Sequence, residues 1–157
     1  MYKKILAPLD GSPLAECTLA HLKEVVTGCN IPEVVVLRVV EPLSSQTVAA
    51  YAEVGSGRDL LSSAEQQNRE EARKYAAEVV EKLKKDGVAA EAVLVNGEPA
   101  EQILDYARKN QVDLIVMSTH GRSGISRWVM GSVADRVVRH AAIPVFLISP
   151  QGCRVSA

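Results

Sequence analysis

Five short apolar runs, rich in β-branched residues, constrain the fold of this chain more than any other feature. They cover residues 3–9, 33–40, 90–95, 113–118 and 144–149. Several, such as EVVVLRVV, are continuously apolar, whereas a strand with one face in water alternates apolar and polar side chains. Continuous apolar strands are required by a parallel sheet that is covered on both faces. The sequence therefore predicts an α/β fold.

Helical patterns separate these runs, because apolar residues between them recur at steps of three and four. The four stripes are Ala15, Leu19, Leu22 and Val26; Ala72, Tyr75, Ala76, Val79, Val80 and Leu83; Ala100, Ile103, Leu104 and Ala107; and Val133, Val137, Val138 and Ala141. Strands that alternate with helices are joined by right-handed crossovers. The order βαβαβαβαβ predicts one Rossmann-like, doubly wound sheet of five parallel strands in the order 3-2-1-4-5, with four helices.

The segment from residue 41 to about residue 59 fits neither pattern. It is rich in Ser, Ala and Gly and contains Pro42. Unstructured connections of this length in compact domains are functional lids or disordered segments. We therefore predict a mobile loop here.

Composition excludes several classes of partner. A net charge of −1 without a Lys/Arg block gives no footprint for nucleic acid or an anionic membrane, and 4% aromatic residues supply no base-stacking surface. No apolar run approaches the about 18 residues that cross a bilayer, and the chain start lacks a signal-peptide core. The three cysteines are far apart without metal-ligand spacing, so we expect reduced thiols. We predict a cytoplasmic protein.

The predicted strand order also predicts where a ligand binds. In open α/β sheets ligands lie beyond the carboxyl ends of the strands, where the strand order reverses. With the order 3-2-1-4-5 this point lies between the first and fourth strands, which end in APLDG and MSTHG. The residues that follow these two strands therefore face the predicted crevice.

Glycine and serine near the fourth helix favour a phosphate ligand. Gly121 permits a positive φ and a close backbone approach, and Gly131 and Ser132 lie where bare helix N–H groups and the helix dipole attract an anion. We expect the Ser132 hydroxyl to cap this helix with Asp135 as a capping-box partner. The alternative is that the glycines only form turns and Ser132 is only a cap.

Charged residues near the same crevice suggest a metal ion but no catalytic group. Asp10 follows the first strand and could hold a divalent cation that bridges phosphates, or could be a turn residue. Arg122 and Arg127 flank the glycines and could neutralise phosphate charge. His120 has no carboxylate placed to orient it, so we predict no catalytic residue.

The stretches STHGRSGISRWVMGS and KKILAPLDGS together resemble the universal stress protein family. The ATP-binding branch of that family carries glycine, two residues, glycine, nine residues, glycine and then Ser or Thr. Here the pattern is Ser118, Gly121, Gly131 and Ser132 at the same spacing, with serine in place of the first glycine. The resemblance implies an adenine nucleotide alpha hydrolase-like domain over residues 1–149 and a C-terminal tail at 150–157.

This resemblance also implies ATP as the ligand and a set of binding residues, and Mg²⁺ would accompany the ATP at Asp10 as inferred above. The phosphates would lie against Gly121, Gly131, Ser132 and the backbone of Val133, and adenine against the backbone of Val39. The remaining implied residues wrap the ribose and phosphates or line the walls and floor: Pro8, Leu9, Met117, Ser118, Thr119, His120 and Arg122.

The family further implies a homodimer through the last strand. That strand, PVFLIS, would be an exposed apolar edge in a monomer, and pairing removes this liability. The sequence identifies no other protein partner.

The sequence therefore predicts an ATP-binding stress-response protein that acts as a nucleotide-dependent regulator or sensor. One alternative is a dimeric interaction module that binds no nucleotide, which the serine at position 118 favours. Another is a slow ATPase or autophosphorylating enzyme with Ser132 or Ser123 as acceptor. A nucleotidyl transferase or ATP pyrophosphatase is disfavoured because APLDGSP matches neither S-G-G-x-D-S nor H-x-G-H. No Walker P-loop is present, and a receiver domain lacks its acidic pair.

Overall fold

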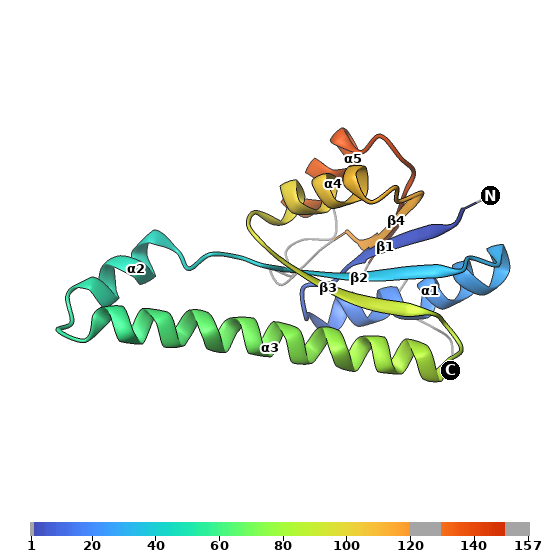
Figure 1. Ribbon diagram of the computed structural model, residues 1–157. Helices are drawn as coiled ribbons and strands as arrows, with labels where there is room; N and C mark the ends of the chain where they lie inside the picture. The colour runs from blue at the N-terminus through green and yellow to red at the C-terminus, as the bar shows by residue number, and fades with distance from the viewer. Residues whose placement is uncertain (1, 120–129, 150–157) are drawn as a thin grey trace.

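The structure, a computed structural model, describes residues 2–119 and 130–149 and contains one parallel sheet between helices (Figure 1). The strands are β1 (Lys4–Pro8), β2 (Glu33–Val40), β3 (Ala90–Asn96), β4 (Leu114–Ser118) and β5 (Val145–Ile148). The helices are α1 (Pro13–Cys29), α2 (Ser45–Ala52), α3 (Gly57–Lys85), α4 (Pro99–Lys109) and α5 (Ser132–His140). All pairings are parallel, in the order β3-β2-β1-β4-β5, which confirms the predicted fold class and strand order.

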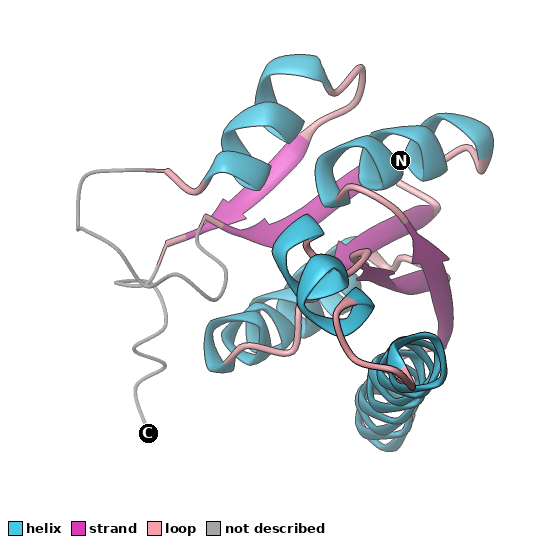
Figure 2. Ribbon diagram, turned by 90° about the vertical axis from the view of Figure 1, so that its left-hand side faces the viewer, coloured by secondary structure: helices cyan, strands magenta, loops and turns pink. Residues whose placement is uncertain are grey.

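Helices cover both faces of the sheet, with α1 and α3 on one side and α4 and α5 on the other (Figures 1 and 2). Successive residues of β1 point to opposite faces, so Ile5 and Ala7 join the core under α1 and α3, and Leu6 joins the core under α4 and α5. Every residue of β2 after Glu33 is buried. Full burial of each such Val or Leu side chain contributes about 1.5–3 kcal/mol, so the continuous apolar runs supply the two cores.

The predicted stripes of α1, α3 and α4 are buried where the structure describes them, except that Tyr75 and Leu104 are half-buried, but the stripe of α5 is partly wrong. Val138 is 41% exposed, whereas Ala134 and Val137 are buried. Ala134 and Val137, three residues apart, point to the sheet together, and the next residue, Val138, lies about 100° further round the helix and faces away from it.

The prediction of four helices and an irregular segment at 41–59 is also wrong, because this segment contains α2 and the start of α3. Ser44 caps α2 by accepting a hydrogen bond from the Thr47 N–H at 3.1 Å. No residue of α2 is buried, and the helix spans only eight residues, which is too short for a periodic apolar pattern to stand out in the sequence.

Together, α2 and the N-terminal part of α3 form an arm that extends beyond the sheet (Figure 1). Apart from Gly57, the buried residues of α3 begin only at Ala72. A side chain at Gly57 would collide with the Tyr51 carbonyl, so the turn between the two helices requires glycine. Val48, Val54 and Leu60 are exposed apolar residues of this arm.

The expectation of reduced thiols is confirmed for Cys29, an exposed free thiol, and is wrong for Cys17, which is disulfide-bonded. Within residues 2–119 and 130–149, no helix is both long enough and apolar enough to cross a membrane.

Asp113 fixes the start of the central strand pair. Its Oδ2 atom accepts hydrogen bonds from the backbone N–H groups of Lys3 at 2.8 Å and Lys4 at 2.9 Å. The N–H of Asp113 in turn donates to the Lys4 carbonyl at 3.0 Å. The hydrogen bonds from Lys3 and Lys4 lower the pKa of the Asp113 carboxyl, because they favour the charged form.

We predict that Asp113→Asn destabilises the protein at pH 7 and that this difference shrinks in acid. A carboxyl whose folded-state pKa is depressed contributes stability above its unfolded pKa of about 3.9 and loses it as the pH falls through the folded value. Urea unfolding of both proteins between neutral pH and about pH 2.5 measures the difference. If the difference in unfolding free energy between the two proteins stayed constant over this range, the charged Asp113 carboxylate would not be the source of the stability.

Candidate functional site

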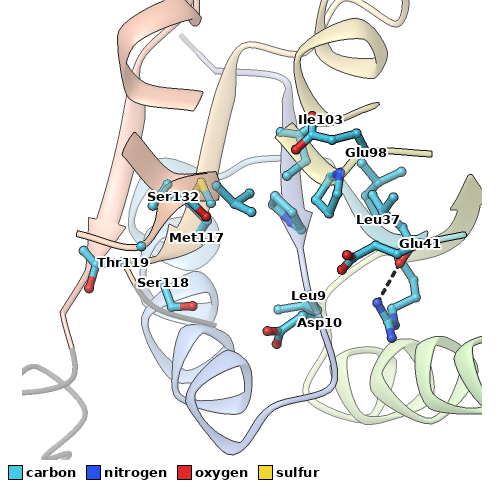
Figure 3. A pocket seen from close by; sticks show the side chains of 17 residues that line it. Leu9, Asp10, Leu37, Glu41, Glu98, Ile103, Met117, Ser118, Thr119 and Ser132 are labelled. Carbon is cyan, nitrogen blue, oxygen red and sulfur yellow. Dashed lines mark hydrogen bonds between the residues drawn. The ribbon is translucent and has the colours of Figure 1, made fainter. Parts of the chain in front are cut away.

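A cleft of 470 Å³ opens at the carboxyl edge of the sheet, between the ends of β1 and β4 (Figure 3). It forms there because β1 leads to α1 on one face of the sheet and β4 precedes α5 on the other. The chain therefore leaves these two neighbouring strands toward opposite faces, which opens a space between their ends. Its lining consists of Pro8, Leu9, Asp10, Leu37, Arg38, Val39, Glu41, Glu98, Pro99, Ile103, Met117, Ser118, Thr119, Gly131, Ser132, Val133 and Ala134.

The cleft brings together ten of the thirteen predicted site residues, which come from four separate parts of the chain. These are Pro8, Leu9, Asp10, Val39, Met117, Ser118, Thr119, Gly131, Ser132 and Val133. The other three, His120, Gly121 and Arg122, lie outside the described residues. Their common location is a structural fact, and their role in binding stays a prediction.

At one end of the cleft, α5 begins without a side-chain cap. Gly131 is the N-cap residue, with φ −60° and ψ 148°, and its missing side chain can accept nothing from the first turn. The Gly131 N–H donates to the Thr119 carbonyl at 2.8 Å, which ties the helix start to the end of β4. The backbone N–H groups at the start of a helix lack intrahelical partners, and here they belong to cleft-lining residues.

The predicted capping box at this helix is wrong. Ser132 is the first residue inside α5 rather than its cap, so its side chain is one position too late to close the first turn. The Asp135 carboxylate accepts from Arg139 Nε at 2.8 and 2.9 Å, and its own N–H donates to the Gly131 carbonyl at 2.9 Å. The dipole of α5 therefore meets the cleft through bare main chain.

A second segment of open main chain comes from the end of β2. The Leu9 N–H donates to the Leu37 carbonyl at 3.0 Å, after which β1 leaves the sheet while β2 continues. The Val40 carbonyl accepts from Gly97 on the β3 side, and successive peptide groups of a strand point to opposite neighbours. The peptide groups of Val39 therefore face the cleft, where the Val39 carbonyl accepts from Arg38 Nη1 at 2.7 Å (Figure 3).

Three charged residues that line the cleft were missed by sequence reasoning. Arg38 is only 9% exposed, and Glu41 and Glu98 follow β2 and β3. One signal was available for Arg38, because it is a charged residue inside the continuously apolar run of β2, whose residues after Glu33 are all buried. Figure 3 shows Asp10, Glu41 and Glu98 on one side of the cleft and Ser118, Thr119 and Ser132 on the other.

Asp10 lies half-buried at the end of β1, and its Oδ1 accepts from the Ser12 N–H at 2.9 Å. This bond holds the carboxylate beside the cleft. In the described part of the chain, no three His, Cys, Asp or Glu side chains gather as metal ligands. Mg²⁺ is usually held by one or two carboxylates together with substrate phosphates and water. Asp10 fits that kind of site and not an all-protein metal cage.

Glu98 lines the cleft and is bonded to both helices on this face of the sheet, α4 and α5. Its carboxylate caps α4 by accepting from the N–H groups of Ala100 at 3.2 Å and Glu101 at 2.9 Å. It also accepts from Arg136 Nη1 of α5 at 3.0 Å, and Arg136 Nη2 reaches Glu101 at 2.9 Å. One arginine therefore joins two acidic residues at the start of α4 to the side of α5.

Tyr75 of α3 packs against the core beneath α1 and α3. Its hydroxyl is buried without a hydrogen-bond partner in the described structure. Burial raises the pKa of Tyr75 to about 12, and the charges of Glu16 and Asp10 add to the effect. Tyr75 therefore stays neutral at physiological pH.

Comparison with known proteins relates this chain to one family. The model of the universal stress protein family matches residues 1–149. Universal stress protein MJ0531 of Methanocaldococcus jannaschii is 34% identical over 148 residues, which cover 94% of this chain and 82% of the relative.

Solved structures share the fold. The structure of MJ0577, from the same organism, aligns with a TM-score of 0.80 at 28% identity, covering 95% of this chain and 96% of that one. The universal stress protein from Archaeoglobus fulgidus, solved in complex with dAMP, aligns with a TM-score of 0.64 at 22% identity over 94% and 98% of the two chains. That second likeness is one of fold alone. By the family match and by its relatives, the chain belongs to the universal stress protein family.

Proposed function

We propose that this protein binds ATP and acts as a nucleotide-dependent regulator or sensor in the stress response. The observation that carries the proposal is the uncapped start of α5, which opens into a cleft where the strand order reverses. Helix N-termini of this kind bind phosphate groups through backbone N–H groups and the helix dipole. The dAMP complex of the relative from Archaeoglobus fulgidus supports an adenine nucleotide as the ligand.

In this proposal the nucleotide spans the cleft from β2 to α5. Adenine lies against the peptide edge of Val39, with Met117 in the floor, and the phosphates lie against Gly131, Ser132 and Val133. Pro8, Leu9, Ser118 and Thr119 line the space between, and His120, Gly121 and Arg122 complete the set predicted from the sequence. The cleft volume of 470 Å³ falls within the range of about 300–1,000 Å³ of ligand pockets.

Mg²⁺ enters the proposal as a companion of the phosphates. Asp10, Glu41 and Glu98 line the cleft, whereas Arg38 is the one cation among its described lining residues. A triphosphate would therefore meet unfavourable carboxylate charge unless a cation accompanied it. Asp10 would hold that cation beside the phosphates, which supplies charge neutralisation.

The proposed role is regulatory rather than efficiently catalytic. Efficient phosphoryl transfer needs a base or water-positioning group and usually a Lys or Arg at the γ-phosphate. Arg38, the one cation among the described lining residues, is buried on β2 and donates to the Val39 carbonyl. Slow hydrolysis or autophosphorylation is therefore a lesser part of the proposal.

A second candidate is a dimeric interaction module of the same fold that binds no nucleotide. The observation that favours it is Ser118, which lines the cleft where the family pattern has glycine. Calorimetric titration of the purified protein with ATP and Mg²⁺ separates the two candidates, since only the first gives saturable binding.

We further propose a homodimer formed through β5. This strand lies at the edge of the sheet, and Phe146 on it is 42% exposed. An unpaired apolar edge favours pairing with another chain. Native mass spectrometry should give the mass of a dimer for the wild type and of a monomer for Phe146→Asp, whereas a monomeric wild type would reject the proposal.

The proposed contact between the phosphates and the start of α5 predicts that Gly131→Val weakens ATP binding about tenfold or more. This is the loss expected for a side chain that blocks a close phosphate contact. Calorimetry with Mg·ATP measures the affinity. Gly55→Val is the matched control, because a side chain at Gly55 meets nothing within 4 Å and the residue lies in the arm. Unchanged affinity of a folded Gly131→Val protein would remove the argument.

The proposed cation site predicts that Asp10→Ala reduces the Mg²⁺ dependence of ATP binding. Affinity for ATP is compared with and without Mg²⁺ for the wild type, for Asp10→Ala and for Asp59→Ala as a control in the arm. If magnesium increases the affinity of all three proteins equally, Asp10 does not hold the ion.

A further inference from the structure

We propose that Arg136 is a positioning residue that neutralises Glu98 on the cleft wall across from the start of α5 and thereby determines how well polyphosphates are accepted. The inference rests on the proposed function, because it concerns phosphates at the start of α5. It adds a residue that does not line the cleft and that the sequence patterns did not single out.

The carboxylate of Glu98 is held at the cleft by three donors. The N–H groups of Ala100 and Glu101 fix it over the start of α4, and Arg136 Nη1 lies 3.0 Å from its Oε2 atom. The carboxylate thus has a fixed position at the cleft wall. Since Glu98 caps α4, it cannot leave that wall without exposing the first turn of the helix.

This fixed charge lies on the same cleft as the start of α5. Glu98 and Pro99 line the cleft together with Ser132, Val133 and Ala134, and α4 packs against α5. A phosphate chain at the start of α5 would therefore meet a carboxylate of the same sign. Like charges raise the free energy of binding in proportion to ligand charge, so the penalty grows from AMP to ATP.

Arg136 offsets this repulsion from the side of α5. It lies about one helical turn after Ser132 and forms ion pairs with Glu98 at 3.0 Å and Glu101 at 2.9 Å. Its side chain is 46% exposed and that of Glu98 is 42% exposed, so the effect is screened by salt. Removing Arg136 leaves two carboxylates at the start of α4 without this cation.

The same helix offers a matched control. Arg139 also forms an ion pair, with Asp135, and its pKa is raised by the hydrogen bond to that carboxylate. Neither Arg139 nor Asp135 lines the cleft. Arg139→Gln therefore removes a cation from α5 without uncovering a carboxylate at the cleft.

The test compares the affinities of adenosine, AMP, ADP and ATP for the wild type, Arg136→Gln and Arg139→Gln at low ionic strength. We expect Arg136→Gln to leave adenosine binding unchanged and to weaken ATP binding about two- to fivefold, the range for a partly exposed charge pair. We expect the intermediate ligands to fall between these limits and the loss to shrink in high salt. Arg139→Gln should bind all four ligands as the wild type does.

A rescue variant separates the charge of Glu98 from a merely structural role of Arg136. If Arg136 acts only by tying α4 to α5, the double variant Arg136→Gln with Glu98→Gln stays weak, because the tie is still absent. If Arg136 acts by neutralising Glu98, the double variant recovers ATP affinity to within about twofold of the wild type.

The outcomes distinguish a failure of this inference from a failure of the proposed ATP binding. A wild type that binds ATP while Arg136→Gln binds it equally well overturns the inference and leaves the proposed function intact. Equal weakening for adenosine and ATP, or a double variant without recovery, also overturns it. A wild type that binds none of the four ligands overturns both.

Discussion

The constraint on which the rest of the structure depends is the departure of the chain to opposite faces after the two central strands. β1 leads into α1, which covers one face, and the chain after β4 reaches α5, which covers the other. Right-handed crossovers from a sheet of this order allow no other arrangement. The carboxyl edge is therefore bare between β1 and β4, and both the α5 start and the end of β2 project into the space.

The main chain and the side chains of the cleft act in opposite electrostatic senses. The start of α5 attracts an anion, whereas Asp10, Glu41 and Glu98 repel it. Under the proposed function, such a cleft would accept an anion that carries a bound cation more readily than a bare anion, and this selection would require no catalytic group.

Much of this fold could be predicted from the sequence, because the three central strands β1, β2 and β4 are buried on both faces and appear in the sequence as continuous apolar runs. The cleft-lining residues of β1 and β4 followed from the strand order alone. Arg38, Glu41 and Glu98 could not be found in that way, since they reach the cleft from β2 and β3 through the side-by-side arrangement of strand ends. The sequence did not predict the helix α2, because this helix contacts α3 and contributes no residue to a core. The cap of α5 was predicted wrongly, because a glycine occupies the position where a serine was expected.

The arm formed by α2 and the first half of α3 gives the domain two levels of local stability. Its backbone hydrogen bonds are satisfied within the helices, yet apart from Gly57 none of the residues of α2 and of α3 before Ala72 is buried. Helices of this kind open with a smaller free energy than the sheet they adjoin. The arm can therefore fray and re-form while β1 and β4 stay paired, so the chain can change its outer shape without any exchange of the buried side chains that hold the cleft.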